Sequence, residues 1–465
     1  MEQLWNAILA WLRNLVGLDL MLSAIEENRP IPAQAYLNLI FSSVTLIVGI
    51  LIAYRTLYMI LGVFGRSRKY PSAPKDKRYC FIVPARNEEL VIGNLIDTVR
   101  AMDYPQELVD IMVVADNCDE DDKTAEIARS KGAIVIERHD MAHRTLGFAL
   151  QYAFREFKKQ GHDIENEYYA YIRLDADNIV SRNYLTKLND CMQNSGFDEA
   201  ITYRNAKNLD ENWIAAMCGM NVYVNVIANA RPRSILKTNQ QVYGPGACFR
   251  SYLLKDGWNW TGLTEDLDIE SDITSRGYIT GYCEEAMFYE EEPTEVRLFV
   301  RQQMRWTRGN LISFGKYAPG LMKSFFKKPT WSKYDIFWQF FPYSFVSFYF
   351  TLAYQLISLV LFFIYGNNGY NWWSFGNWIL TMFGGIYLSN LLIDALTVIR
   401  EWKRFHLSVP KTILYIFLFP IYQIINLPVS CVAGFMKVQW KHIDHHTVVD
   451  PAALEEEEAR RAKKK

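Results

Sequence analysis

The sequence lacks an excess of charge of either sign. Its 50 lysines and arginines stand against 51 aspartates and glutamates, which gives a net charge of −1 over 465 residues. A chain without a basic surplus has no electrostatic reason to bind nucleic acid, so we expect no nucleic-acid partner. The seven cysteines also lack any CxxC pair. Most of them fall in the segment that we assign below to the cytoplasm, so we expect reduced thiols.

The N-terminus lacks the features of a cleaved signal peptide, because Glu2 is acidic and no small-residue cleavage site follows. Arg13 and Asp19 interrupt the apolar stretch "MEQLWNAILAWLRNLVGLDLML". One face of a helix here would carry Leu4, Ile8, Leu12 and Leu15. We interpret residues 1–30 as an amphipathic N-terminal helix at the membrane surface, with a further transmembrane span as the alternative.

Charged residues are missing altogether from several long stretches. None occurs from Ile31 to Tyr54, and the apolar character continues to Phe64, which exceeds the roughly 20 residues that a spanning helix needs. Later in the chain, the segments 337–366, 371–393 and 412–436 are also uncharged. We predict a transmembrane helix over residues 31–64 and three transmembrane helices within residues 337–436.

Basic residues flank these stretches at positions 66–69 and 400–404. By the positive-inside rule they place the middle of the chain in the cytoplasm and make the chain a multi-pass protein of the cell (plasma) membrane. Three spans after a cytoplasmic domain would leave the basic, polar tail at 437–465 outside, against the same rule. Pro420 and Pro428 make a re-entrant last segment an alternative, so the number of spans stays open.

The middle of the chain, residues 70–330, alternates short apolar runs with helical patterns. The predicted strands are 79–83, 110–115, 133–137 and 169–174, and the predicted helices are 90–102, 124–131 and 145–159. This alternation is typical of an α/β domain with a mostly parallel, Rossmann-like sheet that is covered on both faces. Ligands of such sheets bind beyond the carboxyl ends of the strands.

Polar residues follow three of the predicted strands. Asn87 and Glu88 follow the first, where Asn87 looks like a helix cap; Asp116 ends the second, and Asp175 and Asp177 follow the fourth. Residues two apart in an extended stretch point the same way, so the carboxylates of Asp175 and Asp177 face the same side. Such oxygen ligands suit Mg²⁺ or Mn²⁺ together with substrate phosphates, and a capping or loop pair is the structural alternative.

A further acidic candidate lies in "GLTEDLDIESDI", residues 262–273. Glu265 and Asp266 stand at the start of a predicted helix, where acids favour the positive helix end. A solvated helix start is therefore one interpretation. The other is that one of these carboxylates is a general base beside a reacting centre.

The stretch "VRQQMRWTRGN" places Gln302, Arg305 and Trp306 on one face of a predicted helix. The planar fork of Arg305 matches phosphate oxygens, so this face suits a leaving diphosphate. For Arg297 and Arg301 we expect ion pairs with the nearby glutamates at 290–292 and 295 instead.

The order of these motifs resembles the membrane-embedded, processive family 2 glycosyltransferases, such as the cellulose, curdlan and hyaluronan synthases. The matching segments are Pro84 to Glu88, Asp116, Asp175 to Asp177, Thr264 to Asp266, and Gln302 to Trp306. The resemblance implies a cytoplasmic GT-A glycosyltransferase domain inserted between transmembrane helices, with interface helices toward its end. It departs from the family at "RTLGFAL", where Leu146 replaces a lysine and Arg144 is left to supply the charge.

The resemblance also implies roles for single residues. Asp266 would be the catalytic base, and Asp177 with Asp175 would hold Mg²⁺ or Mn²⁺. The substrate-binding residues would be Pro84, Asn87, Glu88, Asp116, Asp175, Glu265, Gln302, Arg305 and Trp306. Within this set, Asp116 would contact the uracil and ribose, Gln302 and Arg305 the diphosphate, and Trp306 the acceptor sugar.

As a whole, the resemblance implies an inverting, processive enzyme that polymerises UDP-glucose into a β-glucan and secretes it through its own spans. The expected partners are a UDP-sugar donor, the growing polysaccharide and the lipid bilayer. A UDP-N-acetylglucosamine or hyaluronan-type synthase is one alternative, and a catalytically inactive membrane scaffold or sensor is another. We expect no cyclic di-GMP-binding domain, and no partner subunit or oligomer is specified.

The C-terminal segment "WKHIDHH" contains His442, His445 and His446. Relatives carry a similar segment where the chain leaves the membrane, so we favour that interpretation over a metal site. The charged residues that follow predict a solvated helix or a disordered tail without an assigned function.

Overall fold

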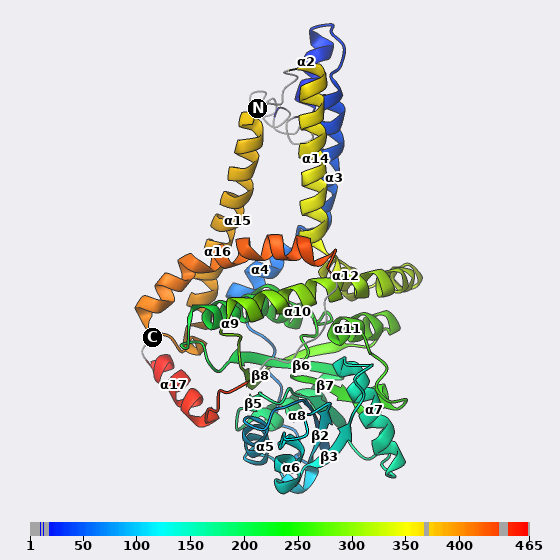
Figure 1. Cartoon of the computed structure of the whole chain (residues 1–465), viewed down its shortest axis with the longest axis vertical. Coiled ribbons are helices and arrows are strands. Elements are labelled where there is room, and N and C mark those ends of the chain that lie inside the picture. The colour runs from blue at the N-terminus through cyan, green and yellow to red at the C-terminus, as the bar shows by residue number, and fades with distance from the viewer. Residues whose placement is uncertain (1–9, 11–12, 14–17, 367–371, 437–444, 464–465) are drawn as a thin grey trace. The chain divides into compact units, whose positions relative to one another are not determined.

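The computed structural model describes the chain except residues 1–9, 11–12, 14–17, 367–371, 437–444 and 464–465 (Figure 1). Two compact units form. The smaller contains residues 1–57 and 343–390, and the larger contains residues 58–342 and 391–465. Half of the predicted N-terminal helix at 1–30 lies outside the described residues, and helix α2 (Asp19–Glu26) is the helix described there.

The smaller unit is built on two long apolar helices, α3 (Ala33–Ile52) and α14 (Tyr343–Tyr365). Polar and aromatic contacts join their facing sides. Gln34 Nε2 donates to Ser358 Oγ at 2.9 Å, Tyr354 OH donates to Asn38 Oδ1 at 2.9 Å, and the rings of Phe41 and Tyr354 stack at 4.2 Å. The outward sides are mostly apolar and exposed, and the hydroxyls there, such as those of Thr45 and Ser347, donate to backbone carbonyls of their own helix.

Among the described residues, five helical segments are long and apolar enough to cross a membrane: Ala33–Phe64, Trp213–Leu236, Tyr343–Tyr365, Phe375–Arg404 and Val409–Ala433. The first joins α3 to α4 (Tyr54–Phe64). The segment predicted to begin at Phe337 begins instead at Tyr343, because helix α13 (Trp331–Phe340) ends before it. Such segments indicate a membrane protein.

The segment Trp213–Leu236 differs from the other four. Buried residues make up 61% of its apolar window, against 6–28% for the rest. It consists of α9 (Trp213–Asn225), a π-helical turn (Val226–Ala230) and α10 (Arg231–Leu236). Its side chains join the core of the larger unit, so its hydrophobicity is satisfied inside the protein.

An eight-stranded sheet forms the centre of the larger unit, in the order β3-β2-β1-β4-β7-β6-β8-β5. The strands are β1 (Tyr79–Ala85), β2 (Val109–Asp116), β3 (Ile134–Arg138), β4 (Ala170–Arg173), β5 (Ile179–Val180), β6 (Glu199–Ala206), β7 (Ala247–Arg250) and β8 (Thr280–Glu290). The first four confirm the predicted strands. Four of the seven strand pairings are parallel, as predicted. The sheet is nevertheless mixed, because β7 pairs antiparallel with both β4 and β6, and β5 antiparallel with β8.

Helices cover both faces of this sheet, as predicted. They include α5 (Ile92–Arg100), α6 (Thr124–Ser130), α7 (Leu146–Lys159) and α8 (Tyr184–Ser195). Successive residues of β1 alternate between the two cores: Cys80 and Ile82 join one, while Phe81 and Val83 join the other. Every residue of this strand except Pro84 is buried, which explains its continuous apolar sequence.

Four further helices complete the larger unit: α11 (Glu265–Arg276), α12 (Val296–Lys327), α16 (Val409–Ala433) and α17 (Pro451–Lys463). In the sequence, α15 (Trp372–Glu401) begins among the residues of the smaller unit and ends among those of the larger one. Helix α17 belongs to the predicted polar tail. It packs on the larger unit, where Asn205 Nδ2 donates to Glu458 Oε1 at 3.1 Å and Arg461 Nη2 donates to the Leu407 carbonyl at 2.7 Å.

Candidate active site

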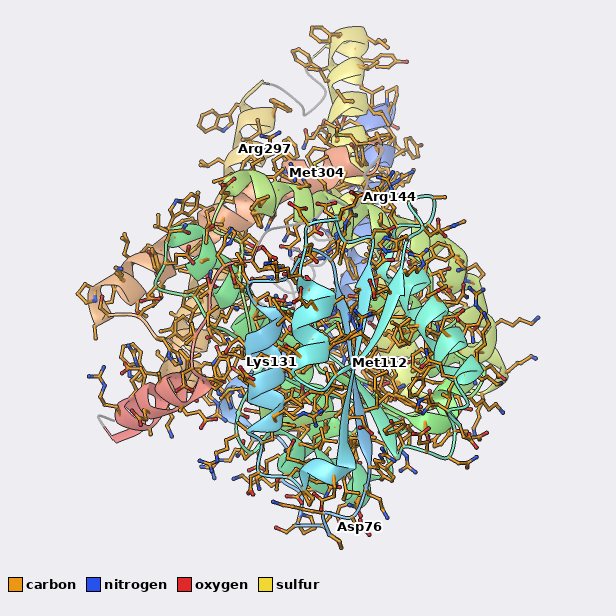
Figure 2. All side chains as sticks on the ribbon, turned by 60° about the horizontal axis from the view of Figure 1, so that its bottom comes forward. Asp76, Met112, Lys131, Arg144, Arg297 and Met304 are labelled. Atoms are coloured by element: carbon orange, nitrogen blue, oxygen red, sulfur yellow. The ribbon has the colours of Figure 1, made fainter. Side chains whose placement is uncertain are left out.

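A pocket of about 240 Å³ opens beyond the carboxyl ends of β1, β2 and β4. In Figure 2, Arg144 lies at the same end of the larger unit as Arg297 and Met304 of α12, and Asp76 lies at the opposite end. The predicted site residues that line the pocket are Pro84, Glu88, Asp116, Asp175, Asp177, Glu265, Asp266, Gln302, Arg305 and Trp306. Residues more than 200 positions apart in the sequence therefore share one cavity.

Asn87 is the predicted site residue that does not line this pocket. It is also not the helix cap that the sequence suggested, because α5 begins only at Ile92. Its backbone is left-handed (φ 54°), and its side chain braces a neighbouring loop. Asn87 Nδ2 donates to Asp119 Oδ2 at 2.7 Å, and Asn87 Oδ1 accepts from the Asp119 backbone N–H at 2.9 Å. Asn87 thus supports the wall of the site from behind.

Asp116 ends β2 with its carboxylate largely buried. Arg138, the last residue of the neighbouring strand β3, donates from Nη1 to Asp116 Oδ1 at 2.6 Å. Burial raises the pKa of Asp116, and Arg138 opposes that shift. Sequence reasoning missed Arg138, because the two residues meet only through the pairing of β2 with β3.

Asp175 and Asp177 follow β4 at the pocket wall. Arg173 Nη2 donates to Asp175 Oδ1 at 3.0 Å. The Glu291 backbone N–H and Asn178 Nδ2 donate to the two oxygens of Asp177, at 2.8 and 3.2 Å. Both carboxylates are thus oriented by donors, and each keeps oxygen lone pairs for a further ligand.

No group of three metal-ligating side chains is preassembled within the residues that the structure describes. Mg²⁺ or Mn²⁺ characteristically takes one or two carboxylates and completes its shell with water and substrate phosphates. Asp175 and Asp177 supply that kind of oxygen pair. The residues present therefore suit a divalent cation that binds together with a phosphorylated substrate.

Asp266 lies in the first turn of α11, beside Glu265. Burial and the neighbouring Glu265 raise the pKa of Asp266 to about 7, although Arg173 and Arg305 draw it down. Arg173 Nη1 lies 2.9 Å from Glu265 Oε1, so this arginine bridges Glu265 and Asp175. A carboxylate whose pKa lies near neutrality can accept a proton at the pH of a cell.

Helix α12 brings Gln302, Arg305 and Trp306 to the pocket on one face, as their spacing requires. Arg301 also lines the pocket. The prediction that Arg297 and Arg301 pair with the preceding glutamates is wrong for the described residues: Glu290 and Glu292 bind Arg204 at 2.8 and 3.1 Å, and Glu291 lies 3.2 Å from Lys207. These three acids are therefore paired with basic residues of β6 and the chain after it.

His445 is a pocket residue to which sequence reasoning gave no role. Its Nδ1 lies 3.1 Å from both carboxylate oxygens of Glu88. Burial alone would lower the pKa of His445, but Asp177 and Glu88 outweigh it and raise the pKa to about 10. The imidazolium therefore offsets part of the negative charge at the pocket wall. His442, of the same segment, lies outside the described residues.

The chain after His445 is fastened to the larger unit. The backbone N–H groups of His446 and Thr447 donate to the two carboxylate oxygens of Glu291, at 3.2 and 3.0 Å. Lys207 Nζ donates to the Thr447 carbonyl at 2.6 Å. This C-terminal segment is therefore part of the site. The signal in the sequence was the histidine cluster itself, which spacing alone could not place.

Comparisons with known proteins agree with this geometry. Residues 172–422 match the family described as glycosyl transferase family group 2, and residues 80–257 match glycosyl transferase family 2. The probable glycosyltransferase YdaM of Bacillus subtilis (strain 168) is 25% identical over 328 residues, which cover 67% of this chain and 72% of that protein.

Among solved structures, the mannosyltransferase PcManGT from Pyrobaculum calidifontis, in complex with GDP-Man and Mn²⁺, is similar with a TM-score of 0.51. The match covers 84% of this chain and 97% of that one, at 12% sequence identity. At this identity the likeness concerns the fold. It supports a GT-A-like α/β domain with several candidate membrane helices flanking it.

Proposed function

The chain belongs to glycosyl transferase family group 2, and on that premise we propose that it is an inverting, processive synthase that polymerises UDP-glucose into a β-glucan. Membership of the family makes the chain a sugar transferase with a nucleotide-sugar donor. The observation that carries the finer proposal is the single pocket in which Asp175, Asp177, Asp266 and Arg305 meet. A leaving diphosphate, its cation and an acceptor hydroxyl need these groups together.

The donor half of the pocket suits a uridine diphosphate sugar. Asp116, held by Arg138, offers a carboxylate to the uracil and ribose, and Gln302 with Arg305 offers an amide and a guanidinium to the diphosphate. Asp175 and Asp177 would hold Mg²⁺ or Mn²⁺ there. When bound, the cation neutralises charge that grows on the departing diphosphate. The mannosyltransferase from Pyrobaculum calidifontis, solved with GDP-Man and Mn²⁺, supports a divalent cation.

The acceptor half places Asp266 as the base. As the acceptor hydroxyl oxygen forms its bond to the anomeric carbon, its proton passes to Asp266, and the bond from that carbon to the diphosphate oxygen breaks. Attack opposite to the leaving group inverts the anomeric centre. Arg305 meets the negative charge that develops on the leaving UDP, so it stabilises the transition state more than the bound donor. Trp306 offers a ring on which the acceptor sugar stacks.

Secretion is proposed from the joining of this site to membrane helices in one chain. We place the chain in the plasma membrane. We place its larger unit on the cytoplasmic side, because residues 66–69 and 400–404 are basic. The growing glucan would leave through the helices of the same chain. Protein in lipid vesicles with the larger unit outward tests this step: polymer protected from added glucanase supports it, and fully digestible polymer contradicts it.

The donor is tested by release of UDP from purified protein with Mg²⁺ or Mn²⁺. UDP-glucose, UDP-N-acetylglucosamine, UDP-galactose and UDP-glucuronate are offered singly and in pairs. Turnover with UDP-glucose alone supports the glucan synthase. Turnover with UDP-N-acetylglucosamine, or only with a pair, supports the chitin-type or hyaluronan-type alternative.

The Asp266→Asn variant and the exposed control Asp256→Asn accompany each donor. We expect UDP release to be lost in Asp266→Asn and unchanged in Asp256→Asn. If UDP release persisted at the full rate in Asp266→Asn, the hydrolysis of the UDP-sugar would be assigned to a contaminant. The alternative of a catalytically inactive scaffold or sensor would then be favoured.

A further inference from the structure

Helix α16 (Val409–Ala433) has the length and composition of a membrane span. At about 1.5 Å per residue its 25 residues extend over roughly 37 Å, enough to cross the hydrocarbon core of a bilayer. Length and composition do not decide whether an apolar helix crosses a bilayer or lies along it. The contacts at its two ends and on its two faces do.

One face of α16 packs along the larger unit. The rings of Tyr422 and Phe299 lie 4.6 Å apart, and Thr307 Oγ1 donates to Ser430 Oγ at 3.5 Å. Eight residues separate the two contacts on each helix, so α16 runs beside α12 in the same direction (Figure 1). Arg308 of α12 donates to the carbonyl of Gly434, the residue that ends α16.

Helix α9 also contacts this face. Gln423 Nε2 donates to Asn221 Oδ1 at 3.3 Å, and the hydroxyl of Tyr422 lies 3.7 Å from Cys218 Sγ. The buried positions of α16 include Thr412, Tyr415, Phe419 and Tyr422, which recur at three- and four-residue steps. They form one continuous stripe along the helix.

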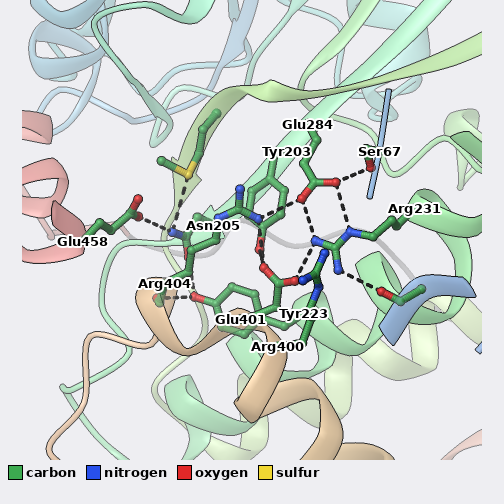
Figure 3. Close-up of polar contacts among 12 residues, drawn as sticks. Ser67, Tyr203, Asn205, Tyr223, Arg231, Glu284, Arg400, Glu401, Arg404 and Glu458 are labelled. Carbon is green, nitrogen blue, oxygen red and sulfur yellow. Dashed lines mark hydrogen bonds and ion pairs between the residues drawn. The ribbon is translucent and has the colours of Figure 1, made fainter. Parts of the chain in front are cut away.

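The chain before α16 is fixed to the same unit through a buried cluster of charges (Figure 3). Arg231 of α10 binds Glu401 at 2.6 Å and Glu284 of β8 at 2.6 Å. Tyr223 OH donates to the Arg404 carbonyl at 3.0 Å. The end of α15 and the turn after it are therefore anchored on the sheet.

The chain after α16 returns to the same unit. Beyond the undescribed residues 437–444, the chain is at the pocket again, where Glu291 and Lys207 hold Thr447. Both ends of α16 are thus bound to the larger unit. A helix that crossed a bilayer would carry one end to the opposite surface, out of reach of these partners.

The outward face of α16 is an apolar stripe. Val409, Ile413, Phe417, Ile421 and Ile425 follow one another at four-residue steps and are 53, 53, 52, 46 and 40% exposed. No charged side chain occurs from Thr412 to Met436. An exposed apolar surface of this length is unfavourable in water and favourable at the boundary between lipid headgroups and acyl chains.

We propose that α16 lies in the membrane surface, with this stripe bound to the acyl chains of the leaflet next to the larger unit. The bilayer is within reach, because the same chain carries the apolar helices α3, α14 and α15. Along the chain, two crossings, by α14 and α15, then lie between α13 and α16. An even number of crossings returns the tail to the side of the pocket, which removes the conflict between the basic tail and the positive-inside rule.

This placement ties the bilayer to the pocket. Phe299, Thr307 and Arg308 contact α16, whereas Gln302, Arg305 and Trp306 of the same helix line the pocket. The lipid surface therefore supports the outer side of the helix that carries the pocket arginine.

Spin-label depth measurements on full-length protein in lipid nanodiscs test the proposal. A label on a noncanonical amino acid replaces Val409, Phe417, Ile425 or Val432, one at a time, and leaves the native cysteines in place. Collisions with oxygen and with a water-soluble nickel complex report depth. Leu380 and Leu388, exposed on α15, serve as matched controls along a helix that crosses.

We expect all four α16 labels at one shallow depth, about 5–10 Å below the headgroups, while the two α15 labels differ in depth. Labels at Val409 and Val432 in opposite leaflets, with Phe417 and Ile425 deepest, would overturn the proposal. Labels shielded from both reagents would also overturn it, because a protein surface such as a second copy would then cover the stripe.

Discussion

The larger unit contains two buried groups of charged residues that differ in how their charges are matched. In the cluster around Arg231, each carboxylate faces arginines, and although burial raises the pKa of Glu284, Arg231 and Arg404 lower it to about 2. In the pocket, burial and Glu265 leave Asp266 with a pKa of about 7. Matched charges fix the ends of membrane helices to the sheet. Incompletely matched charges leave a group that can exchange a proton.

The largest effect is expected from the pocket. Asp177→Asn removes one of two oxygen ligands of the proposed cation, so UDP release should fall by about 10³-fold. Titration of Mn²⁺ in the presence of UDP, followed by electron paramagnetic resonance, should show weaker binding in the variant. The exposed Asp210→Asn is the matched control and should behave as the native protein. If Asp177→Asn bound Mn²⁺ as tightly as the native protein, Asp177 would not be a ligand of the cation.

The matched cluster should respond in stability. Arg231→Met leaves Glu284 and Glu401 buried without this partner, which typically costs about 3–5 kcal/mol. The midpoint of thermal unfolding in detergent measures the loss. The exposed Arg155→Met on α7 is the control. If Arg231→Met unfolded at the same temperature as the native protein, the cluster around Arg231 would not stabilise the fold. Its proposed difference from the pocket would then be wrong.

Arg305→Lys keeps the charge and loses the planar fork. If Arg305 binds the leaving diphosphate through two parallel hydrogen bonds, kcat should fall by about 10²-fold with little change in the unfolding midpoint. The neighbouring Arg301→Lys is the control for the role of Arg305, because Arg301 also lines the pocket but has no proposed role. Equal losses in both variants would mean that the pocket needs positive charge in general.

The two groups should also have opposite pH signatures. Because the pKa of Asp266 is raised in the folded state, its charge opposes folding as pH rises from about 4 through 7. Asp266→Asn should therefore raise the unfolding midpoint at pH 8 and change it little at pH 4. Because the pKa of Glu284 is lowered, its contribution is present above its unfolded value and is lost as pH falls toward 2. Glu284→Gln should therefore lower the midpoint at pH 7 and have less effect at pH 3.

Activity gives a smaller and independent check of the same pKa. The base must be ionised, so kcat/KM should decline about tenfold for each pH unit below 7. A profile that stays flat down to pH 5 would assign the proton transfer to another group.

Sequence reasoning placed the parts of the fold and site that depend on local pattern. Strands β1 to β4 were found because their residues are continuously apolar, and the pocket acids because they follow those strands. Strands β6 to β8 were missed, since their polar residues, such as Arg204 and Glu284, are buried only through distant partners. Distant partners also hid three residues of the site. Arg138 meets Asp116 across two strands, Arg173 meets Glu265 of α11, and His445 of the C-terminal segment meets Glu88.

The catalytic assignment is tested most directly by measuring UDP release and the thermal unfolding midpoint on one preparation of Asp266→Asn. The contrast between the two charged groups predicts a loss of UDP release of about 10³-fold together with an unchanged or higher midpoint. Retained UDP release, or a loss of release that simply follows a fall in the midpoint, would contradict it.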